Sequence, residues 1–457
     1  MNIVIVGAGT VGRYIAFLLS KENHNVILID KDAKSLEEAA WEMDIAVRQG
    51  SGEDWQLLDE LMELAPNLFL AMTGNDAVNL VACSIAKNLG YPLTIARVKD
   101  NRYLNGTRLD FARLFDVDYF IAPEVLAAND IYKYMVSPGS LSLENFAHGA
   151  VKMRTIAIPS TWSKAGIPLK DLKIPSGIVV GVIRRSVEDL ENPPHNTRMK
   201  SIFPHGADHI MPGDEVTFIG EADKIEEIHT FFGIKTKPVS SVVIVGGSLV
   251  GLNLAKMLQE RGYDVRLMDK DRAVCSLLAE QLPRCTIINQ DASDLQFLLS
   301  EKVERSDLFV VCTNHDEVNI LISLVAKEAG CTNVAALIFN NSYIPLLNRL
   351  GISQIVSPRV SAANHILSLA ISGRVTSLVS LYNNDVEIVE VSVSADSKIT
   401  GIPLADLGPL MPKEFLIAMI QNRGQIMIAN GARIISPGDS VIVITNPKHS
   451  GELEKIF

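Results

Sequence analysis

Two glycine-rich turns in this chain have the spacing that lets a backbone hold a pyrophosphate. Residues 7–12 read GAGTVG and residues 246–251 read GGSLVG, each after a short apolar, β-branched run. In the first turn, Gly7 permits the tight turn, Gly9 lets the backbone approach a phosphate, and Gly12 allows a helix to pack closely on the strand. A helix beginning at such a turn offers unpaired N–H groups to the phosphates. These features predict a nucleotide site in each half. The alternative is a nucleotide-free scaffold that keeps its glycines for packing.

An acidic residue closes the next predicted strand after each turn. Asp30 follows the apolar run at 25–29, and Asp269 stands 239 positions later. A carboxylate at this position accepts hydrogen bonds from the ribose hydroxyls of adenosine and repels a 2′-phosphate. We therefore expect NAD(H), or ATP and ADP, rather than NADP. The alternative for Asp30 is a solvated turn aspartate before Lys31.

The carboxyl edge of the first predicted sheet carries further polar residues. Thr73 and Gly74 lie just past the fourth predicted strand, where ligands bind in sheets of this type. Asn75 and Asp76 follow, and they either contribute to the site or only cap the next helix. Arg97 ends the fifth predicted strand on the same edge. We expect it either to pair with a phosphate or to form a surface ion pair.

The second predicted site departs from the first in two places. Ser248 takes the position of the middle glycine, and Leu337 stands in place of the arginine that ends the fifth strand. Asp269 keeps the ribose role, and Thr313 and Asn314 keep the role of the residues after the fourth strand. A nucleotide still fits there, and the alternative is a vacant or weakly binding second site.

The residues expected to contact nucleotide come from the glycine-rich turns, the two strand-ending acids and the carboxyl edges. They are Gly7, Ala8, Gly9, Thr10, Val11, Asp30, Thr73, Gly74, Arg97, Gly246, Gly247, Ser248, Leu249, Val250, Asp269, Thr313 and Asn314. We predict neither a catalytic residue nor a metal ligand.

The two sites belong to a tandem duplication. The glycine-rich turns are 239 residues apart, and the order of motifs is the same in both halves. Corresponding segments include VILIDKDAKS (26–35) and VRLMDKDRAV (265–274), PEVLAAND (123–130) and PRVSAANH (358–365), and MPGDEVTFIG (211–220) and SPGDSVIVIT (436–445). Such repetition indicates that each half is one structural unit with a larger first part and a smaller second part.

The larger part of each half predicts an α/β fold with a doubly wound, Rossmann-like parallel sheet, because strands and helices alternate. In the first half the expected strands are 2–6, 25–29, 45–49, 67–72, 93–97 and 119–121. These runs are apolar and β-branched, as is typical of strands buried on both faces. The smaller part predicts a small α+β lobe, with strands near 151–158, 178–184, 386–393 and 415–421.

Domain boundaries follow from this pattern. Helical stretches are expected between the parts at 125–136, 140–149 and 360–371, and residues 190–214 are expected to form a loop insertion. The predicted domains are Rossmann domains at 1–123 and 239–358, crossover helices at 124–149 and 359–372, and small lobes at 150–235 and 373–457.

Composition narrows the classes of partner. The chain has 457 residues and a formal net charge of −11, which disfavours nonspecific binding to nucleic acid or anionic lipid. Its five cysteines are scattered without a CxxC pair, which is typical of reduced, mostly buried thiols in a cytosolic protein. No apolar run reaches the roughly 18 to 20 residues that span a bilayer.

His205, Asp208 and His209 are candidate metal ligands, but Pro204 and Gly206 favour an exposed loop.

The duplicated motifs resemble those of the TrkA family, the peripheral subunits of bacterial Trk potassium uptake systems, built from two tandem RCK (regulator of conductance of potassium, or KTN) units. The resemblance covers essentially the whole chain. It rests on the glycine-rich turn, IDKD, a TxxDxxN box, the PxxxAAN crossover and the GxPLxDL…PGD lobe, most of which occur twice. It implies Rossmann lobes that bind NAD(H) or adenine nucleotides, and a homo-oligomeric ring, commonly a tetramer formed as a dimer of dimers.

The resemblance also implies a partner and a location. The ring would dock on the cytoplasmic face of a TrkH- or TrkG-type membrane subunit, where nucleotide-driven movement opens or closes the potassium pore. The chain would then be cytoplasmic and peripheral on the inner membrane.

The alternative function is a soluble NAD-dependent oxidoreductase. Such an enzyme needs a proton donor or acceptor beside the nicotinamide. His24, His315 and His365 lie near the predicted sheet edges, and only His315 stands beside a nucleotide motif, where the first half has Asn75. Because the duplication does not keep a histidine there, we predict a regulator and no enzyme.

Overall fold

The structure is a computed structural model in which two units divide the chain. Unit 1 comprises Met1–Tyr132 and Val239–Ala370, and unit 2 comprises Lys133–Pro238 and Ile371–Phe457. Each unit therefore combines corresponding parts of the two halves. The described residues are all but 22–23, 105–107, 137–139, 189–196, 235–237, 353, 371–374, 383–384, 409–410, 412–413 and 423.

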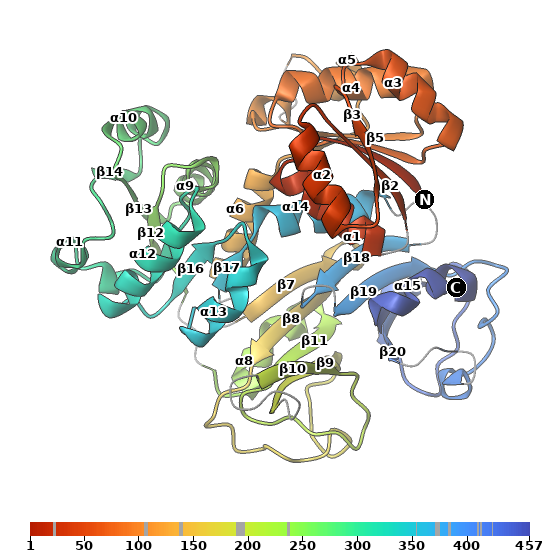
Figure 1. Ribbon diagram of the computed structural model, residues 1–457. Helices are drawn as coiled ribbons and strands as arrows, with labels where there is room; N and C mark the ends of the chain where they lie inside the picture. The colour runs from red at the N-terminus through yellow and green to blue at the C-terminus, as the bar shows by residue number, and fades with distance from the viewer. Residues whose placement is uncertain are drawn as a thin grey trace. The chain divides into compact units, whose positions relative to one another are not determined.

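The first Rossmann domain is a six-stranded parallel sheet in the order β3-β2-β1-β4-β5-β6. Figure 1 shows α1 and α2 on one face of this sheet and α3 and α4 on the other. The strands are β1 (Asn2–Val6), β2 (Asn25–Asp30), β3 (Ala46–Gln49), β4 (Leu68–Ala71), β5 (Leu93–Arg97) and β6 (Tyr119–Ile121). The helices are α1 (Thr10–Lys21), α2 (Ala33–Glu42), α3 (Trp55–Glu60), α4 (Asp76–Leu89), α5 (Phe111–Leu114) and α6 (Pro123–Val136).

The second Rossmann domain repeats this architecture in the order β14-β13-β12-β15-β16-β17. Its strands are β12 (Ser241–Val245), β13 (Asp264–Asp269), β14 (Thr286–Asn289), β15 (Leu308–Val311), β16 (Val334–Leu337) and β17 (Gln354–Val356). Its helices are α9 (Leu249–Glu260), α10 (Arg272–Gln281), α11 (Leu295–Ser300), α12 (Asp316–Glu328), α13 (Ile344–Arg349) and α14 (Pro358–Ala370). The predicted Rossmann-like sheets are confirmed in both halves.

The apolar runs form these strands because helices cover both faces of each sheet. All four residues of β4 are buried, and so are all four residues of β15. Strand order reverses between β1 and β4, and again between β12 and β15. Ligands of such sheets bind beyond the carboxyl ends of the strands at this reversal, which is where both glycine-rich turns lie.

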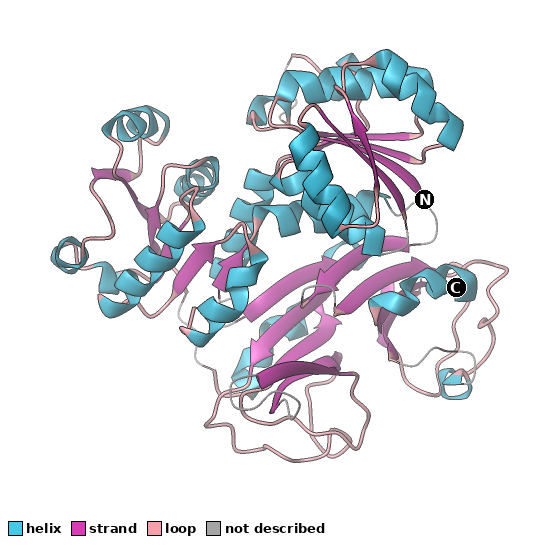
Figure 2. Ribbon diagram, in the orientation of Figure 1, coloured by secondary structure: helices cyan, strands magenta, loops and turns pink. Residues whose placement is uncertain are grey.

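Unit 2 holds two five-stranded antiparallel sheets, in the orders β10-β9-β11-β8-β7 and β18-β19-β22-β20-β21. Figure 2 draws strands in magenta. The strands are β7 (Ser140–Phe146), β8 (Val151–Ala157), β9 (Ile178–Glu188), β10 (Thr197–Ile202), β11 (Glu215–Glu221), β18 (Val375–Leu381), β19 (Val386–Ser392), β20 (Phe415–Asn422), β21 (Gln425–Ile428) and β22 (Ser440–Thr445). The helices are α7 (Ala222–Glu226), α8 (Ile228–Phe231) and α15 (Pro447–Ile456). One apolar core contains residues of both sheets, among them Met153 and Ile388.

Two predictions for the smaller parts were wrong. The stretch 140–149 is not a second crossover helix, because Ser140–Phe146 forms β7 and pairs with β8. Its sequence, SLSLENF, alternates apolar and polar residues with the period of a strand. The segment 190–214 is not loop throughout, because Thr197–Ile202 forms β10 and pairs with β9. Residues 190–196 lie outside the described residues.

The described part of the chain offers neither a membrane-spanning helix nor a cluster of metal ligands. None of its helices combines the length and apolar character that crossing a bilayer requires. The described residues contain no group of three side chains placed to hold a metal ion. Asp208 instead closes a turn, because its Oδ2 accepts a hydrogen bond from the backbone N–H of His205 at 2.6 Å.

Thiol labelling provides a test of the Rossmann cores. All five cysteines are free, and only Cys285 is not buried. Burial raises the pKa of Cys312 to about 12 and that of Cys331 to about 11. Because the thiolate is the reactive form, iodoacetamide at pH 8 should label Cys285 first and the other four only after unfolding. Rapid labelling of Cys312 in the native protein, read by peptide mass spectrometry, would contradict the closed packing beneath the second glycine-rich turn.

Candidate functional site

The first glycine-rich turn has the geometry that its spacing predicts. Gly7 has a φ of +109°, and a Cβ there would lie 2.9 Å from the backbone N of Thr73. A Cβ on Gly12 would lie 1.9 Å from the carbonyl O of Gly7, whereas a Cβ on Gly9 would have no heavy atom within 4 Å. Gly7 and Gly12 are therefore required by the fold. Gly9 and Thr10 are exposed and leave open the space in which a phosphate would approach.

The second turn keeps the first and last of these glycines. Gly246 has a φ of +110°, and a Cβ on Gly251 would lie 2.1 Å from the carbonyl O of Gly246. Ser248 replaces the middle glycine and caps α9. Its Oγ accepts from the N–H of Gly251 at 3.2 Å and donates to the carbonyl O of Cys312 at 2.6 Å. The serine side chain is thus turned toward the protein, and it satisfies an N–H group that a phosphate would otherwise use.

The remaining turn residues divide between the core and the surface. The side chains of Ala8, Val11 and Val250 are buried, so only their backbone can face a ligand. Leu249 is exposed, as the first residue of α9. Gly247 is partly buried at the position that corresponds to Ala8.

The two strand-ending acids are held in the same way. The Oδ2 atom of Asp30 accepts from the N–H of Ala8 at 2.6 Å, and its Oδ1 accepts from the N–H of Asp32 at 2.9 Å. The Oδ2 atom of Asp269 accepts from the N–H of Gly247 at 2.6 Å, and its Oδ1 from the N–H two residues on at 2.8 Å. Each carboxylate oxygen keeps a lone pair for a further donor. Both acids are therefore oriented beside their glycine-rich turn and can still bind ribose hydroxyls.

A pocket of about 430 Å³ surrounds the second acid. It is lined by the glycine-rich turn, Asp269, Asp291, the edge residues Thr313 and Asn314, and the exposed His315. Apolar side chains, among them Val274 and Ile322, complete its lining. The replacement of the middle glycine by Ser248 therefore does not close the second site.

The TxxDxxN box holds the carboxyl edge of each sheet together. Asn79 is buried, and its Oδ1 accepts from Thr73 through the backbone N–H at 3.0 Å and the hydroxyl at 2.6 Å. Its Nδ2 donates to the carbonyl oxygens of Thr73 at 3.1 Å and Arg97 at 2.8 Å. Asn319 makes the same four bonds in the second domain. Thr73 and Thr313 thus lie at the site, but their hydroxyls are held by an asparagine.

The aspartate and the preceding residue of the box have separate roles. Asn75 caps α4, because its Oδ1 accepts from the N–H of Val78 at 3.3 Å. Asp76 instead accepts from the backbone N–H groups of Lys99 and Asp100, each at 3.0 Å. The helix cap is therefore Asn75, and Asp76 ties α4 to the loop after β5.

Arg97 forms an ion pair, but it is not the surface ion pair expected as the alternative to phosphate binding. Its Nη2 lies 2.7 Å from the Oε1 of Glu124, and the two side chains are only 14% and 17% exposed. The pair is therefore largely buried. A phosphate would have to compete with this carboxylate, so a role for Arg97 in binding remains a prediction. Leu337, its counterpart, is buried in the second sheet.

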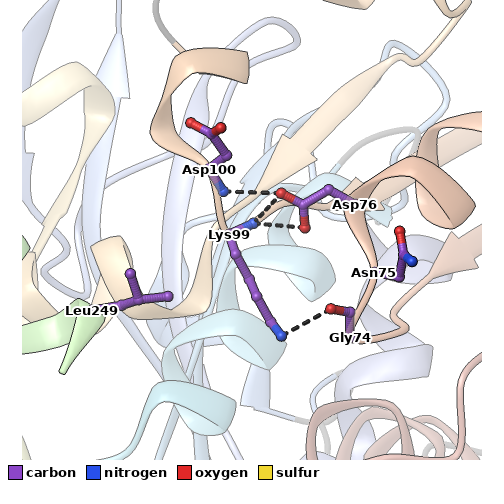
Figure 3. Close-up of a pocket in the computed structure, with 6 residues that line it drawn as sticks. All are labelled: Gly74, Asn75, Asp76, Lys99, Asp100 and Leu249. Carbon is purple, nitrogen blue, oxygen red and sulfur yellow. Dashed lines mark hydrogen bonds between the residues drawn. The ribbon is translucent and has the colours of Figure 1, made fainter.

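A pocket of about 470 Å³ adjoins the exposed Gly74 (Figure 3). Lys99 Nζ donates to the carbonyl O of Gly74 at 2.8 Å across it. Asp76 and Asp100 complete the polar lining, and Leu249 of α9 borders the pocket from the second Rossmann domain. The loop after β5 thus meets the second glycine-rich turn within unit 1.

The sequence interpretation missed two side chains beside the first glycine-rich turn. Tyr14 of α1 and Arg359 of α14 line a pocket of about 600 Å³ together with Gly9 and Thr10. The signal was present in the aligned crossover segments, PEVLAAND and PRVSAANH, where Arg359 replaces Glu124. No site was predicted from this exchange of an acid for a cation.

The chain matches two protein-family models and is similar to relatives along its whole length. The TrkA-N domain matches residues 3–123 and 242–358, and the TrkA-C domain matches residues 388–457. The chain is 33% identical over 465 residues to "Trk system potassium uptake protein TrkA homolog 1" of Methanosarcina mazei, with 100% of both chains covered. It is 29% identical to "Trk system potassium uptake protein TrkA" of Haemophilus influenzae, covering 100% of this chain and 98% of the relative.

Solved structures share the fold at lower sequence identity. The structure described as "GsuK Channel" aligns with a TM-score of 0.62 and 17% identity, covering 100% of this chain and 78% of that one. A structure described as "GsuK channel bound to NAD" aligns with a TM-score of 0.60, at the same identity and coverage. At 17% identity, this similarity shows a shared fold, that is, the same arrangement of helices and strands.

Proposed function

Because this chain belongs to the TrkA family, the non-enzymatic regulatory subunits of Trk potassium uptake, we propose that its two glycine-rich sites bind an adenine nucleotide and that binding gates a potassium-translocating membrane partner. Membership of this family also means that the chain is not an enzyme. The chain is a regulator, and the alternative of a soluble NAD-dependent oxidoreductase is set aside.

The ligand we propose is NAD(H), or ATP and ADP. The observation that carries this proposal is the pair of acids, Asp30 and Asp269, each bonded to its glycine-rich turn at 2.6 Å. A carboxylate in that place suits two ribose hydroxyls and disfavours a 2′-phosphate. The NAD-bound channel of the same fold supports a nucleotide of this class.

The partner we propose is a membrane subunit of the TrkH or TrkG type, on whose cytoplasmic face the chain lies peripherally. The chain would act as a homo-oligomeric ring, a dimer of dimers. The proposed functional divisions are Rossmann domains at 1–123 and 239–358, crossover segments that begin at 124 and 359, and small lobes that end at 235 and 457, with β7 (Ser140–Phe146) assigned to the first small lobe. A nucleotide shifts such a ring only if it binds the open and closed arrangements with different affinity.

Calorimetric titration tests the nucleotide sites. The purified chain should bind NADH or ATP, and NADPH should bind at least tenfold more weakly. Asp30→Ala and Asp269→Ala should each weaken one binding event by about a hundredfold, because two charge-assisted hydrogen bonds to ribose are lost. In liposomes that contain the membrane partner, Asp30→Ala should remove the nucleotide response of potassium flux while assembly is kept.

Asp44→Ala is the matched control, since Asp44 is an exposed acid of the same Rossmann domain that does not line the described pockets. Its affinities should equal those of the parent. Equal binding by the parent and both site variants would contradict the assignment of the acids, and absence of any binding would contradict the proposed function.

A further inference from the structure

Arg359 reaches the first glycine-rich turn from the other repeat. It lies in the first turn of α14, which packs beside α1 within unit 1 (Figure 1). The pocket of about 600 Å³ that it lines also contains Gly9 and Thr10. Since a phosphate would approach the turn at Gly9, this arginine borders the space that the phosphate would occupy.

Within the residues that the structure describes, the guanidinium of Arg359 forms neither an ion pair nor a hydrogen bond. It lies 5.0 Å from the centre of the Tyr14 ring, on which it stacks. Its Nε is buried and has no hydrogen-bond acceptor there. Burial lowers the pKa of Arg359, so the cation has lost hydration without gaining a counter-ion.

Neighbouring charged groups are already paired. Arg13, on the same pocket wall, forms ion pairs with Glu38 at 3.0 Å and Glu42 at 2.8 Å. Asp316 attracts Arg359 electrostatically, but its oxygens accept from the backbone N–H groups of Phe339 at 2.8 Å and Asn340 at 2.7 Å. Arg359 is therefore the cation in this pocket that still needs an anion.

We propose that Arg359 binds a phosphate of the nucleotide held by the first glycine-rich turn, so that this site is built from both repeats. The inference rests on the proposed function, because it requires a nucleotide at that turn. It assigns to the first site a preference for ligands that carry a diphosphate, such as a nucleoside diphosphate or a dinucleotide.

The duplication indicates that this feature belongs to one site only. Position 359 corresponds to position 124, where the first repeat has a glutamate that pairs with Arg97. The hydrogen bonds around these two positions also correspond between the repeats. Asn341 Nδ2 lies 3.4 Å from the Tyr14 hydroxyl, and its counterpart Asn101 donates to the residue that corresponds to Tyr14. The two repeats thus make related contacts, but the residue at this position is the cation Arg359 in one repeat and the acid Glu124 in the other.

The test compares ligands that differ only in phosphate number. Adenosine, AMP and ADP are titrated into full-length Asp269→Ala protein, which leaves the first site to be measured, with and without Arg359→Met. ADP affinity should fall ten- to hundredfold, as expected for a lost charge-assisted hydrogen bond, while adenosine affinity stays unchanged. Arg359→Lys should give an intermediate loss, since lysine keeps the charge without the planar donor geometry.

A structural role for Arg359 would give a different pattern. If the side chain only stabilised the fold, Arg359→Met would lower the unfolding temperature of the nucleotide-free protein and weaken adenosine and ADP alike. If Arg359 binds a phosphate, that temperature should stay within about 2 °C, because a half-buried cation that forms no ion pair in the described part of the chain contributes little to stability. Only the stabilisation added by ADP should shrink.

Arg305→Met is the charge control, because Arg305 is an arginine of the second repeat whose side chain is 72% exposed. It should leave all three affinities unchanged. Equal ADP affinity in the Arg359→Met and parent chains overturns the inference alone, provided that Asp30→Ala still weakens ADP. If Asp30→Ala also leaves ADP binding unchanged, the proposed function of the first site fails with it.

Discussion

Replacing Gly12 by alanine is expected to lower the free energy of unfolding by about 3 kcal/mol and to abolish nucleotide binding at the first site. The new Cβ would lie 1.9 Å from the carbonyl O of Gly7, a backbone atom that cannot rotate away. Relief would require α1 to move off the sheet, and the turn that faces the phosphate would move with it. Urea unfolding followed by circular dichroism, with NADH titration of the native protein, measures both effects.

Gly9→Ala separates the packing role from the binding role. No heavy atom lies within 4 Å of a Cβ built on Gly9, so the stability should change by less than about 0.5 kcal/mol. The methyl group would project into the open space of the turn, and nucleotide affinity should fall at least tenfold. Gly251→Ala should resemble Gly12→Ala, because its Cβ would lie 2.1 Å from a carbonyl oxygen. A stable Gly12→Ala protein with parental affinity would contradict this account.

The parallel sheets could be predicted because their strands depend on local and periodic signals. The central strands of both sheets are short apolar runs between turn residues, as is typical of strands buried on both faces. The strand expected at 93–97 is β5 (Leu93–Arg97), and the strand expected at 67–72 is β4 (Leu68–Ala71). The acids at the ends of β2 and β13 were identified by their place after a strand, which is also a local signal.

The features that escaped prediction depend on partners far away in the sequence. The stretch 140–149 was predicted to be helical, whereas Ser140–Phe146 forms β7, whose partner β8 begins only at Val151. Arg97 was expected either to pair with a phosphate or to form a surface ion pair, whereas its partner in a largely buried ion pair is Glu124, 27 positions later. Arg359 was overlooked because its pocket is formed by residues more than 300 positions apart. Spacing within one repeat does not reveal which residues of the other repeat complete a site.

Asn79→Ala is expected to destabilise the chain by about 3 kcal/mol, more than any helix cap in this domain. Asn79 is fully buried and makes four hydrogen bonds, to the N–H, hydroxyl and carbonyl of Thr73 and to the carbonyl O of Arg97. Its removal leaves buried donors and acceptors without partners at the carboxyl ends of β4 and β5. The nucleotide site should therefore loosen together with the fold, and urea unfolding with NADH titration would record both losses.

Asn75→Ala is the matched control, because Asn75 is an exposed asparagine of the same segment that caps α4 with one hydrogen bond. It should cost only about 1 kcal/mol. Asn319→Ala should reproduce the larger loss, since Asn319 makes the same four bonds in the second domain. If Asn79→Ala cost no more than Asn75→Ala, the buried amide would not be what holds the two strand ends together. The TxxDxxN box would then have to be explained by direct contact of Asn79 with the ligand.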